Sequence, residues 1–200
     1  MAIFSIFNKI ITKLNKSYEL SKYNPYTVAE YLRKQGAQVG NNCMIVPARL
    51  GTEPYLVKIG NHVAIAQGVK FITHDGGPWI FRSELPDIQV FGPIIIEDNC
   101  VIGENALIFP NVRIGKNSIV GAGSVVISDV PPDTIAIGVP ARPLGSTVKY
   151  KEKCVERWKL QRPPDCVIGP GETWWNAKTF QDNRKKLREH LLKVFEKDLR

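Results

Sequence analysis

Residues 90–130 read VFGPIIIEDNCVIGENALIFPNVRIGKNSIVGAGSVVISDV, and a repeat of six residues runs through them. Its aliphatic positions are, in order, Val90, Ile96, Ile102, Ile108, Ile114, Val120 and Val126. The fourth residue after each of these is again small or apolar, as at Cys100 and Ala106. A period of six fits neither an α-helix nor an alternating strand over this length. It fits a solenoid in which each hexapeptide forms one flat side and one corner of a triangular turn.

The same repeat extends towards the N-terminus. Ile59, Ile65 and Phe71 share its phase, and Val39 and Ile45 extend it further, with two additional residues before Ile59. In such a fold the inward side chains of one turn stack on those of the next, at the strand spacing of about 4.8 Å. The sequence therefore predicts a mainly β fold, a triangular solenoid of hexapeptide repeats with parallel strands.

The repeat is interrupted once by a long insertion. Phe71 and Val90 are nineteen residues apart, where six would continue the turn. We therefore expect thirteen residues, GPWIFRSELPDIQ at 77–89, to leave the solenoid as a loop. Long excursions from a regular framework carry function more often than the framework itself.

Helical segments are expected on both sides of the repeat. Asn24 and Pro25 have the N-cap and N1 preferences of a helix that Gly36 would end. Apolar residues on one face predict another helix before it and a terminal helix over 179–198. The predicted organisation is an N-terminal helical flank over 1–35, a repeat domain over 36–145, and a basic C-terminal extension with the terminal helix over 146–200.

The net charge of +8 is concentrated at the two ends of the chain. Residues 1–35 carry six basic and two acidic side chains, residues 36–145 carry seven and nine, and residues 146–200 carry fourteen and eight. A nucleic-acid groove should be basic in the domain that forms it, so no nucleic-acid partner is expected. The basic ends fit solvated helices first, and an anionic ligand or membrane surface second.

The sequence predicts a cytoplasmic protein. No stretch approaches the roughly 18–20 apolar residues of a membrane span. The first residues, MAIFSIFNKIITKLNK, have lysines inside their apolar part and no small-residue cleavage site, so they make a poor secretory signal. Their apolar stripe would pack on the protein or on a sister subunit. The alternative is a weak contact with the inner face of a membrane. The four cysteines show no CxxC or metal-binding spacing.

The chain has three histidines, and one of them, His74, lies at the root of the loop. We expect His62 and His190 at solvated positions. With thirteen residues taken out of the register, Asn105 and then Gly123 would lie above His74 at one corner of the solenoid. A base, a carboxamide and bare backbone N–H groups in one column would form a groove with a reactive end. Both Asn105 and Gly123 equally suit ordinary turns.

Two motifs resemble those of a known enzyme family. IGENALIFPNVRIGKNSIVGAGSVVISDVPPDTIAIGVPARPL, residues 102–144, resembles the C-terminal repeats of the hexapeptide acetyltransferases. The branch it resembles most contains galactoside and maltose O-acetyltransferases and the acyltransferases of capsule and lipopolysaccharide clusters. FITHDGGPWIFR, residues 71–82, resembles the active-site hexapeptide and loop of the polysaccharide-modifying members. Over residues 36–145 the resemblance implies a left-handed parallel β-helix, a homotrimer with active sites between subunits, and acetyl-CoA as co-substrate without a metal.

The resemblance also implies roles for individual residues. His74 takes the place of the catalytic histidine, which removes a proton from the acceptor as it attacks the thioester. Asn105, or a backbone N–H in its column, is the expected donor to the developing oxyanion. The expected cofactor contacts are Gly103, Ala122, Gly123, Ile127, Ser128 and, on the nucleotide phosphates, Arg142. Ser128 stands where the family has a lysine, so phosphate binding would depend on Arg142 and on the basic tail with Lys149, Lys151 and Lys153.

The loop supplies the expected acceptor-binding side chains. The loop offers Asp75, Trp79, Arg82 and Glu84. Trp79 could stack on a sugar, and the two carboxylates could hold hydroxyls or an amine. Alternatively, Trp79 packs on the apolar residues of its own loop and Glu84 pairs with Arg82. Asp75 could instead orient His74.

The sequence therefore predicts an acetyl-CoA-dependent O-acetyltransferase that acts on a saccharide of a cell-surface polysaccharide or its precursor. The alternative is N-acetylation of an amino sugar on a nucleotide carrier, since both acceptors need the same proton removal. Two further classes fit less well. A metal-dependent hydratase like the γ-class carbonic anhydrases needs three histidines around zinc, and only His62 and His74 lie on the repeat. A non-catalytic trimeric scaffold would leave the loop and the acetyltransferase motifs unexplained.

Overall fold

The computed structural model describes residues 18–46, 50–170, 172–173 and 178–198. It divides into two compact units, Met1–Thr147 and Val148–Arg200. The helix predicted before Asn24, with its expected contact to a sister subunit or a membrane surface, lies outside the described residues. None of the described helices has the length and the apolar content needed to cross a membrane.

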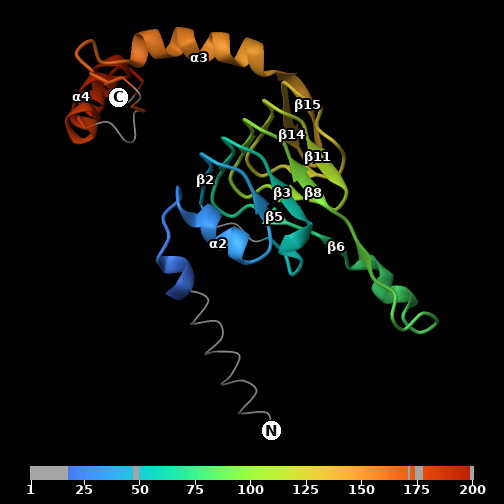
Figure 1. The fold of residues 1–200 in the computed structure, drawn as a ribbon. Helices are drawn as coiled ribbons and strands as arrows, with labels where there is room; N and C mark the ends of the chain where they lie inside the picture. The colour runs from blue at the N-terminus through green and yellow to red at the C-terminus, as the bar shows by residue number, and fades with distance from the viewer. Residues whose placement is uncertain (1–17, 47–49, 171, 174–177, 199–200) are drawn as a thin grey trace. The chain divides into compact units, whose positions relative to one another are not determined.

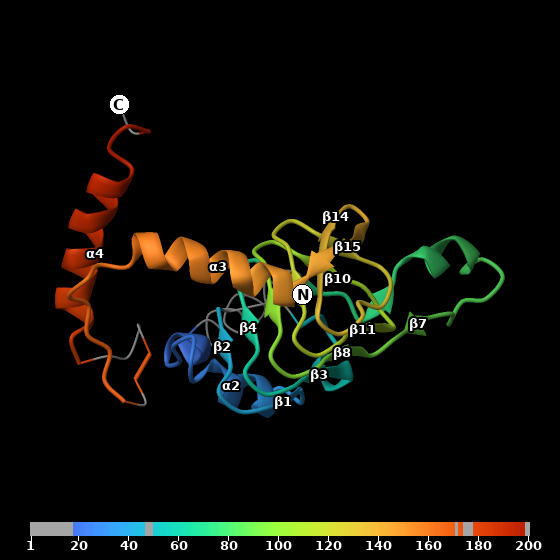
Figure 2. The ribbon, with the colours of Figure 1, turned by 90° about the horizontal axis from the view of Figure 1, so that it is seen from above.

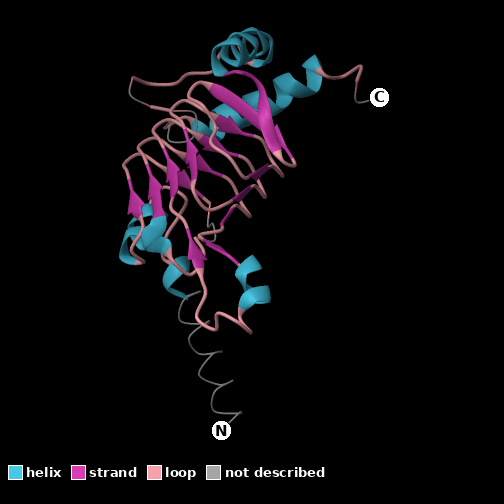
Figure 3. Cartoon of the chain, turned by 90° about the vertical axis from the view of Figure 1, so that its right-hand side faces the viewer, coloured by secondary structure: helices cyan, strands magenta, loops and turns pink. Residues whose placement is uncertain are grey.

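The repeat of the first unit is built from short strands in three sheets, which the chain visits in turn (Figures 1 and 3). One sheet has the order β1, β3, β8, β11 (Gln38–Val39, Val57–Ile59, Ile94–Ile96 and Val112–Ile114). The second has the order β15, β14, β12, β9, β4, β2 (Ala141–Ser146, Thr134–Gly138, Ile119–Val120, Val101–Ile102, Ala64–Ile65 and Met44–Ile45). The third has the order β13, β10, β5 (Val125–Val126, Leu107–Ile108 and Lys70–Phe71).

The strand register confirms the six-residue repeat. Ile102 pairs with Val120 and Ile108 with Val126, in each case eighteen residues further along the chain and in parallel. The repeat positions from Ile96 to Val126 are all at most 1 % exposed, so they form the core. These observations confirm a mainly β chain of parallel hexapeptide repeats. The left-handed sense of the turn stays a prediction.

The predicted register is wrong at the long insertion. Ile65 and Phe71 pair with Ile102 and Ile108, thirty-seven residues further on instead of eighteen. Nineteen residues therefore leave the repeat, and not thirteen. Val90, taken from its spacing as a core position, is 43 % exposed. The error arose because the extra length includes one full hexapeptide, so Val90 has the phase of the repeat without belonging to it.

The excursion is a β-hairpin with a helical turn near its end (Figure 2). Its stem consists of β6 (His74–Asp75) and β7 (Val90–Phe91), which pair antiparallel. The stem closes where the N–H of Gly92 donates to the carbonyl of Thr73, at 2.9 Å. The 3-10 turn η2 (Gly77–Phe81) follows the first strand. The hairpin stem thus places His74 at the boundary between the repeat and the excursion.

A ladder of hydrogen-bonded side chains follows one corner of the repeat. His62, Asn99, Asn117 and Asp133 all have φ between 53° and 59°, the left-handed region that asparagine tolerates better than most residues. Nδ1 of His62 contacts Oδ1 of Asn99 at 2.8 Å, Nδ2 of Asn99 donates to Asn117, and Nδ2 of Asn117 donates to Asp133. Each turn is thereby tied to the next at this corner.

Replacing Asn117 should show the stability that the ladder contributes. Asn117→Ala removes two hydrogen bonds and places a residue with a Cβ, but without a compensating side chain, at φ 59°. We expect a loss of about 2 kcal/mol, seen as a melting temperature lower by about 6 °C. Asn117→Gly keeps the backbone conformation accessible and should lose about half as much. Equal melting temperatures for the two variants would contradict the assigned cost of the backbone conformation.

The two ends of the repeat carry different elements. At the N-terminal end, α2 (Val28–Lys34) buries Val28 and Leu32 in the core. It begins later than predicted, with Thr27 in the N-cap position, because Asn24 caps the preceding turn through the N–H groups of Tyr26 and Thr27. Its Arg33 donates to the carbonyls of Val39 and Gly40. At the other end, β15 pairs antiparallel with β14.

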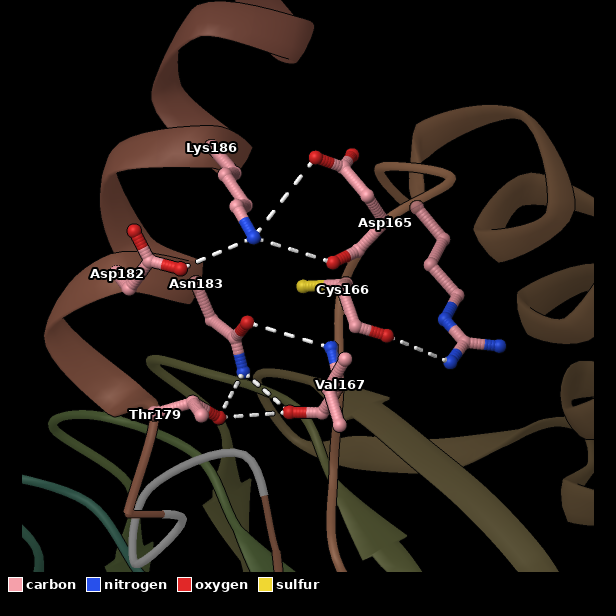
Figure 4. A network of polar contacts seen from close by, with 8 residues as sticks. Asp165, Cys166, Val167, Thr179, Asp182, Asn183 and Lys186 are labelled. Carbon is pink, nitrogen blue, oxygen red and sulfur yellow. Dashed lines mark hydrogen bonds and ion pairs between the residues drawn. The ribbon is translucent and has the colours of Figure 1, made fainter.

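The second unit contains α4 (Phe180–Val194) and all but the first residue of α3 (Thr147–Gln161). The sequence indicated α4, within 179–198, but not α3. Figure 4 shows how α4 is held to the segment before it. The side chain of the buried Asn183 makes two hydrogen bonds with the backbone of Val167: Nδ2 donates to the carbonyl of Val167 at 2.7 Å, and Oδ1 accepts from the N–H of Val167 at 3.3 Å. Lys186 bridges Asp182 on its own helix, at 2.9 Å, and Asp165. These contacts lie within the second unit.

Candidate functional site

His74 lies at the root of the hairpin, three residues after β5 ends. Its side chain is 47 % exposed. Thr73, immediately before it, is fully buried, because the chain passes from the core to the surface at this point. The ring of Phe91 on the opposite strand of the stem approaches the imidazole edge-on, with 6.4 Å between centroids. The histidine is therefore fixed at its backbone and open to solvent at part of its ring.

A carboxylate from the preceding turn contacts this histidine. Oε2 of Glu53 lies 3.0 Å from Nδ1 of His74 and accepts a hydrogen bond from Oγ1 of Thr73 at 2.6 Å. Its other oxygen, Oε1, accepts from the hydroxyl of Thr52. The Glu53 side chain is only 12 % exposed. Because Nδ1 faces Glu53, Nε2 is the ring nitrogen that remains for a substrate.

The environment keeps Glu53 ionised. Burial opposes the charge, but the hydrogen bonds from Thr52, Thr73 and His74, with the charge that His74 carries when protonated, outweigh it and lower the pKa of Glu53 to about 2. An ionised carboxylate is an acceptor only, so it suits the three donor groups around it.

Glu53 is not among the site residues predicted from the sequence, although the spacing of the repeat carries a signal for it. Ile45 and Ile65 pair twenty residues apart, two more than in a regular turn. The two extra residues fall between Ile45 and Ile59, as predicted, and the irregular segment there includes Glu53. A second irregularity one turn away from His74 was the available clue.

The structure contradicts the predicted column of His74, Asn105 and Gly123. The N–H of Asn105 donates to the carbonyl of Gln67, so Asn105 stacks above the corner at Gly68. The N–H of Gly123 donates to Glu104, which keeps Gly123 in the same column as Asn105. His74 is not part of it. The prediction failed because it removed thirteen residues from the register instead of nineteen.

The other two histidines use a ring nitrogen in contacts that support the fold. Nδ1 of His62 belongs to the corner ladder. Nε2 of His190 lies 3.1 Å from the carbonyl of Leu160 in the second unit. In the described part of the chain, no three or more histidine, cysteine, aspartate or glutamate side chains gather as a group that could hold a metal ion.

Four predicted cofactor residues flank β13, a strand of the same sheet as β5, the strand that ends just before His74. Ala122 and Gly123 come before β13, Ile127 and Ser128 follow it, and all four are exposed. Since β5, β10 and β13 are parallel neighbours, His74 and the pair Ile127–Ser128 follow the same ends of strands in one sheet. Two strand spacings separate β5 from β13, about 10 Å.

The two remaining predicted cofactor residues differ in their surroundings. A Cβ on Gly103 would lie 2.4 Å from the backbone nitrogen of Ala122, so close approach of the next turn requires glycine here whatever binds nearby. Arg142 is exposed on β15, and its guanidinium donates to the carbonyl of Ala141 at 3.1 Å. Arg142 can reorient towards an anion without breaking an ion pair with a described residue.

The predicted acceptor residues all lie on the hairpin and are exposed. Asp75 accepts a hydrogen bond from the N–H of Gly77 at 2.8 Å, while Glu53 holds the position beside Nδ1 of His74. The guanidinium of Arg82 lies over the ring of Trp79, 4.8 Å from its centroid. Trp79 is 69 % exposed. Among the ion pairs of the described residues, none joins Glu84 to Arg82.

Comparison with known proteins places the chain in a family. Residues 93–128 match a family model described as the hexapeptide repeat of succinyl-transferase. Protein CapG of Staphylococcus aureus is 51 % identical over 128 residues, which cover 62 % of this chain and 74 % of CapG. The galactoside O-acetyltransferase of Lactococcus lactis subsp. lactis is 31 % identical over 150 residues, 64 % of this chain and 71 % of that enzyme.

A relative with a different acceptor matches over a shorter range. The 2,3,4,5-tetrahydropyridine-2,6-dicarboxylate N-acetyltransferase of Alkaliphilus metalliredigens is 58 % identical over 50 residues, 25 % of this chain and 21 % of that protein. With these relatives and the parallel repeat, the chain belongs to the hexapeptide-repeat acetyltransferase family. It is therefore an acyltransferase, and its acceptor is a separate question.

Proposed function

We propose that this acetyltransferase moves an acetyl group from acetyl-CoA to a hydroxyl of a saccharide, with His74 as the general base. One observation supports this best: His74 stands at the root of the excursion with Nδ1 against Glu53 and a half-exposed ring. Its free nitrogen, Nε2, can therefore face an acceptor. The acetyltransferase relatives supply the reaction class.

The proposed reaction is a direct transfer between two bound substrates. Nε2 of the neutral imidazole takes the proton of the acceptor hydroxyl while its oxygen attacks the thioester carbonyl. The tetrahedral intermediate then collapses, the bond to sulfur breaks, and the CoA thiolate takes the proton from the imidazolium. General-base catalysis contributes about 10²- to 10⁴-fold in such reactions. Holding both substrates together supplies much of the remainder.

The proposed cofactor path follows the sheet of β5, β10 and β13. The exposed residues Ala122, Ile127 and Ser128 flank β13 and would line the pantetheine arm. Arg142 would pair with the phosphates, for which its planar donor fork is suited. We propose a homotrimer in which neighbouring copies close each site. Asn105 and His74 of one copy lie in different columns of the repeat. In that assembly Asn105 would therefore donate to the oxyanion in a site that contains the His74 of a neighbouring copy.

The hairpin is the proposed acceptor-binding element. Because Arg82 covers one face of the Trp79 indole, the other face is the one that a sugar ring could stack on. The guanidinium next to that ring would attract an anionic group, such as the diphosphate of a nucleotide-linked saccharide. The carboxylates of Asp75 and Glu84 are exposed on the same excursion and could accept hydrogen bonds from hydroxyls.

Acetylation of an amine is the second candidate function. The N-acetyltransferase relative supports it, but the match covers only a quarter of this chain. His74 would remove a proton from an amine as it would from a hydroxyl, so the base cannot distinguish the two. Incubation with acetyl-CoA and paired acceptors, a sugar and its amino-sugar analogue with and without a nucleotide carrier, distinguishes them. Products that resist mild alkaline hydrolysis would identify an amide and contradict the proposed ester.

Binding of CoA should raise the melting temperature of the purified protein. A ligand at about a hundred times its dissociation constant adds roughly 2.7 kcal/mol. Arg142→Ala is expected to weaken CoA binding by about tenfold or more, through loss of a charge-assisted contact, and so to reduce the shift. Arg184→Ala, on the exposed face of α4, is the matched control and should behave as the wild type. An unchanged shift in Arg142→Ala would remove Arg142 from the phosphate site.

A further inference from the structure

Glu53 joins two segments at the place where the repeat becomes irregular. It belongs to the turn with two additional residues, and it contacts the residues that begin the hairpin. One oxygen, Oε2, is shared between Oγ1 of the buried Thr73 and Nδ1 of His74. The other oxygen accepts from Thr52. Three donors converge on one largely buried carboxylate, so its position is determined from several directions.

We propose that Glu53 is the positioning residue of the site: it holds the imidazole of His74 in the tautomer with the proton on Nδ1 and so presents the lone pair of Nε2 to the acceptor. This inference rests on the proposed function, which makes His74 the base. Glu53 touches no substrate and acts through His74 alone. The neighbouring carboxylate, Asp75, is engaged with the N–H of Gly77.

The two threonines determine how well Glu53 can do this. Thr73 precedes His74 directly, so one backbone segment fixes both the imidazole and the hydroxyl that anchors its carboxylate. An ionised carboxylate can only accept hydrogen bonds, so the hydrogen between Glu53 and His74 lies on Nδ1 in this arrangement. During transfer, the same negative charge would stabilise the imidazolium that forms when Nε2 takes the proton.

The tautomer can be measured without any activity. In protein labelled with ¹⁵N at histidine, long-range ¹H–¹⁵N correlation spectra at a pH where the ring is neutral distinguish a protonated from an unprotonated nitrogen. His74→Ala assigns the signals among the three histidines. In the wild type we expect Nδ1 of His74 to be protonated and Nε2 to be unprotonated. In Glu53→Ala we expect a mixture of the two tautomers, with a larger population of the one that carries the proton on Nε2. A spectrum unchanged in Glu53→Ala overturns the proposal.

Kinetics then separate orientation from charge. Glu53→Gln keeps an oxygen that can accept from Nδ1 and should retain the tautomer, with kcat lower by about tenfold. Glu53→Ala should lower kcat by about 30- to 100-fold, and the KM for acetyl-CoA should stay within about twofold in both variants. A parallel rise in that KM would indicate a general distortion of the site and would count against a positioning role.

Variants of Thr73 provide a test that leaves Glu53 in place. Thr73→Val replaces the hydroxyl with a methyl group and should lower kcat several-fold, whereas Thr73→Ser keeps the hydroxyl and should retain kcat near that of the wild type. Glu97→Gln is the control, since Glu97 accepts from Arg113 and from the N–H of Lys116 in a different sheet; it should change neither tautomer nor kcat. A wild-type protein without acetyl transfer would contradict the proposed function, and the tautomer spectra would still decide the role of Glu53.

Discussion

His74→Ala is expected to lower kcat by about 10²- to 10⁴-fold while the dissociation constant of CoA stays within about twofold. The substitution removes the nitrogen that takes the acceptor proton. It leaves unchanged the cofactor path on β13, which lies two strands from β5 in a sheet to which His74 does not belong. The release of free CoA thiol with a saturating acceptor measures kcat, and calorimetric titration measures CoA binding.

His62→Asn is the matched control for this experiment. His62 is a histidine of the same repeat, with φ 53° and a contact to Asn99 that an asparagine can also make. Its replacement should leave kcat within about twofold. Retention of wild-type kcat by His74→Ala would remove His74 from the mechanism, whatever the control shows. Equal losses in both variants would point to a general loss of folded protein, which the melting temperatures would reveal.

Removal of the hairpin tip is expected to abolish most acceptor turnover while leaving CoA binding in place. Asp75 and Val90 pair directly in the antiparallel stem, so Asn-Gly can replace residues 76–89 as a two-residue turn. The shortened chain keeps His74, Glu53 and the cofactor path but loses Trp79 and Arg82. We expect kcat/KM for the acceptor to fall by at least about 10²-fold, because the acceptor is no longer positioned.

Two measurements make this result interpretable. The CoA-induced rise in melting temperature should persist, and light scattering should give the same particle mass as the wild type. Trp79→Ala, which removes one side chain and leaves the hairpin, should raise the acceptor KM more than it lowers kcat. Undiminished acceptor turnover in the shortened chain would show that the acceptor binds elsewhere than on the hairpin.

The regular part of the fold followed directly from the sequence. Ile102, Ile108, Ile114 and Val120 recur every six residues because each must fill the same interior position of successive turns, and all four are buried. Each strand of the repeat buries only its inward side chains, as β11 does with Val112 and Ile114, so the apolar signal falls on fixed positions of the hexapeptide.

The register across the insertion could not be obtained in this way. A spacing argument counts only residues, and nineteen extra residues are indistinguishable from thirteen when the difference is one hexapeptide. Val90 satisfied the period although it lies in a partly exposed stem. For the same reason the sequence placed Asn105 above His74. The observed pairing of Phe71 with Ile108 shows that Asn105 belongs to a different column. Backbone pairing, which composition does not encode, was needed to decide.

Glu53 and α3 escaped the sequence for two other reasons. Glu53 lies twenty-one residues before His74, and only the closure of a turn brings the two together. The helix α3 buries none of its residues within the described chain, so its sequence lacks the clear apolar face that predicts a packed helix. A periodic pattern does not predict contacts between segments that are distant in the sequence. Nor does it predict helices that bury no face.

The elements at the two ends of the repeat determine how far it can grow. A stack of parallel strands presents unpaired N–H and carbonyl groups at its first and last turn, to which another copy could add. Here Arg33 occupies the carbonyls of Val39 and Gly40, and Pro25 accepts from the N–H of Ile45 in the outermost strand. At the far end β15 reverses direction, and its Pro143 has no N–H to offer. At these strands the chain thus occupies backbone groups to which another copy could otherwise add, which counters elongation into fibres.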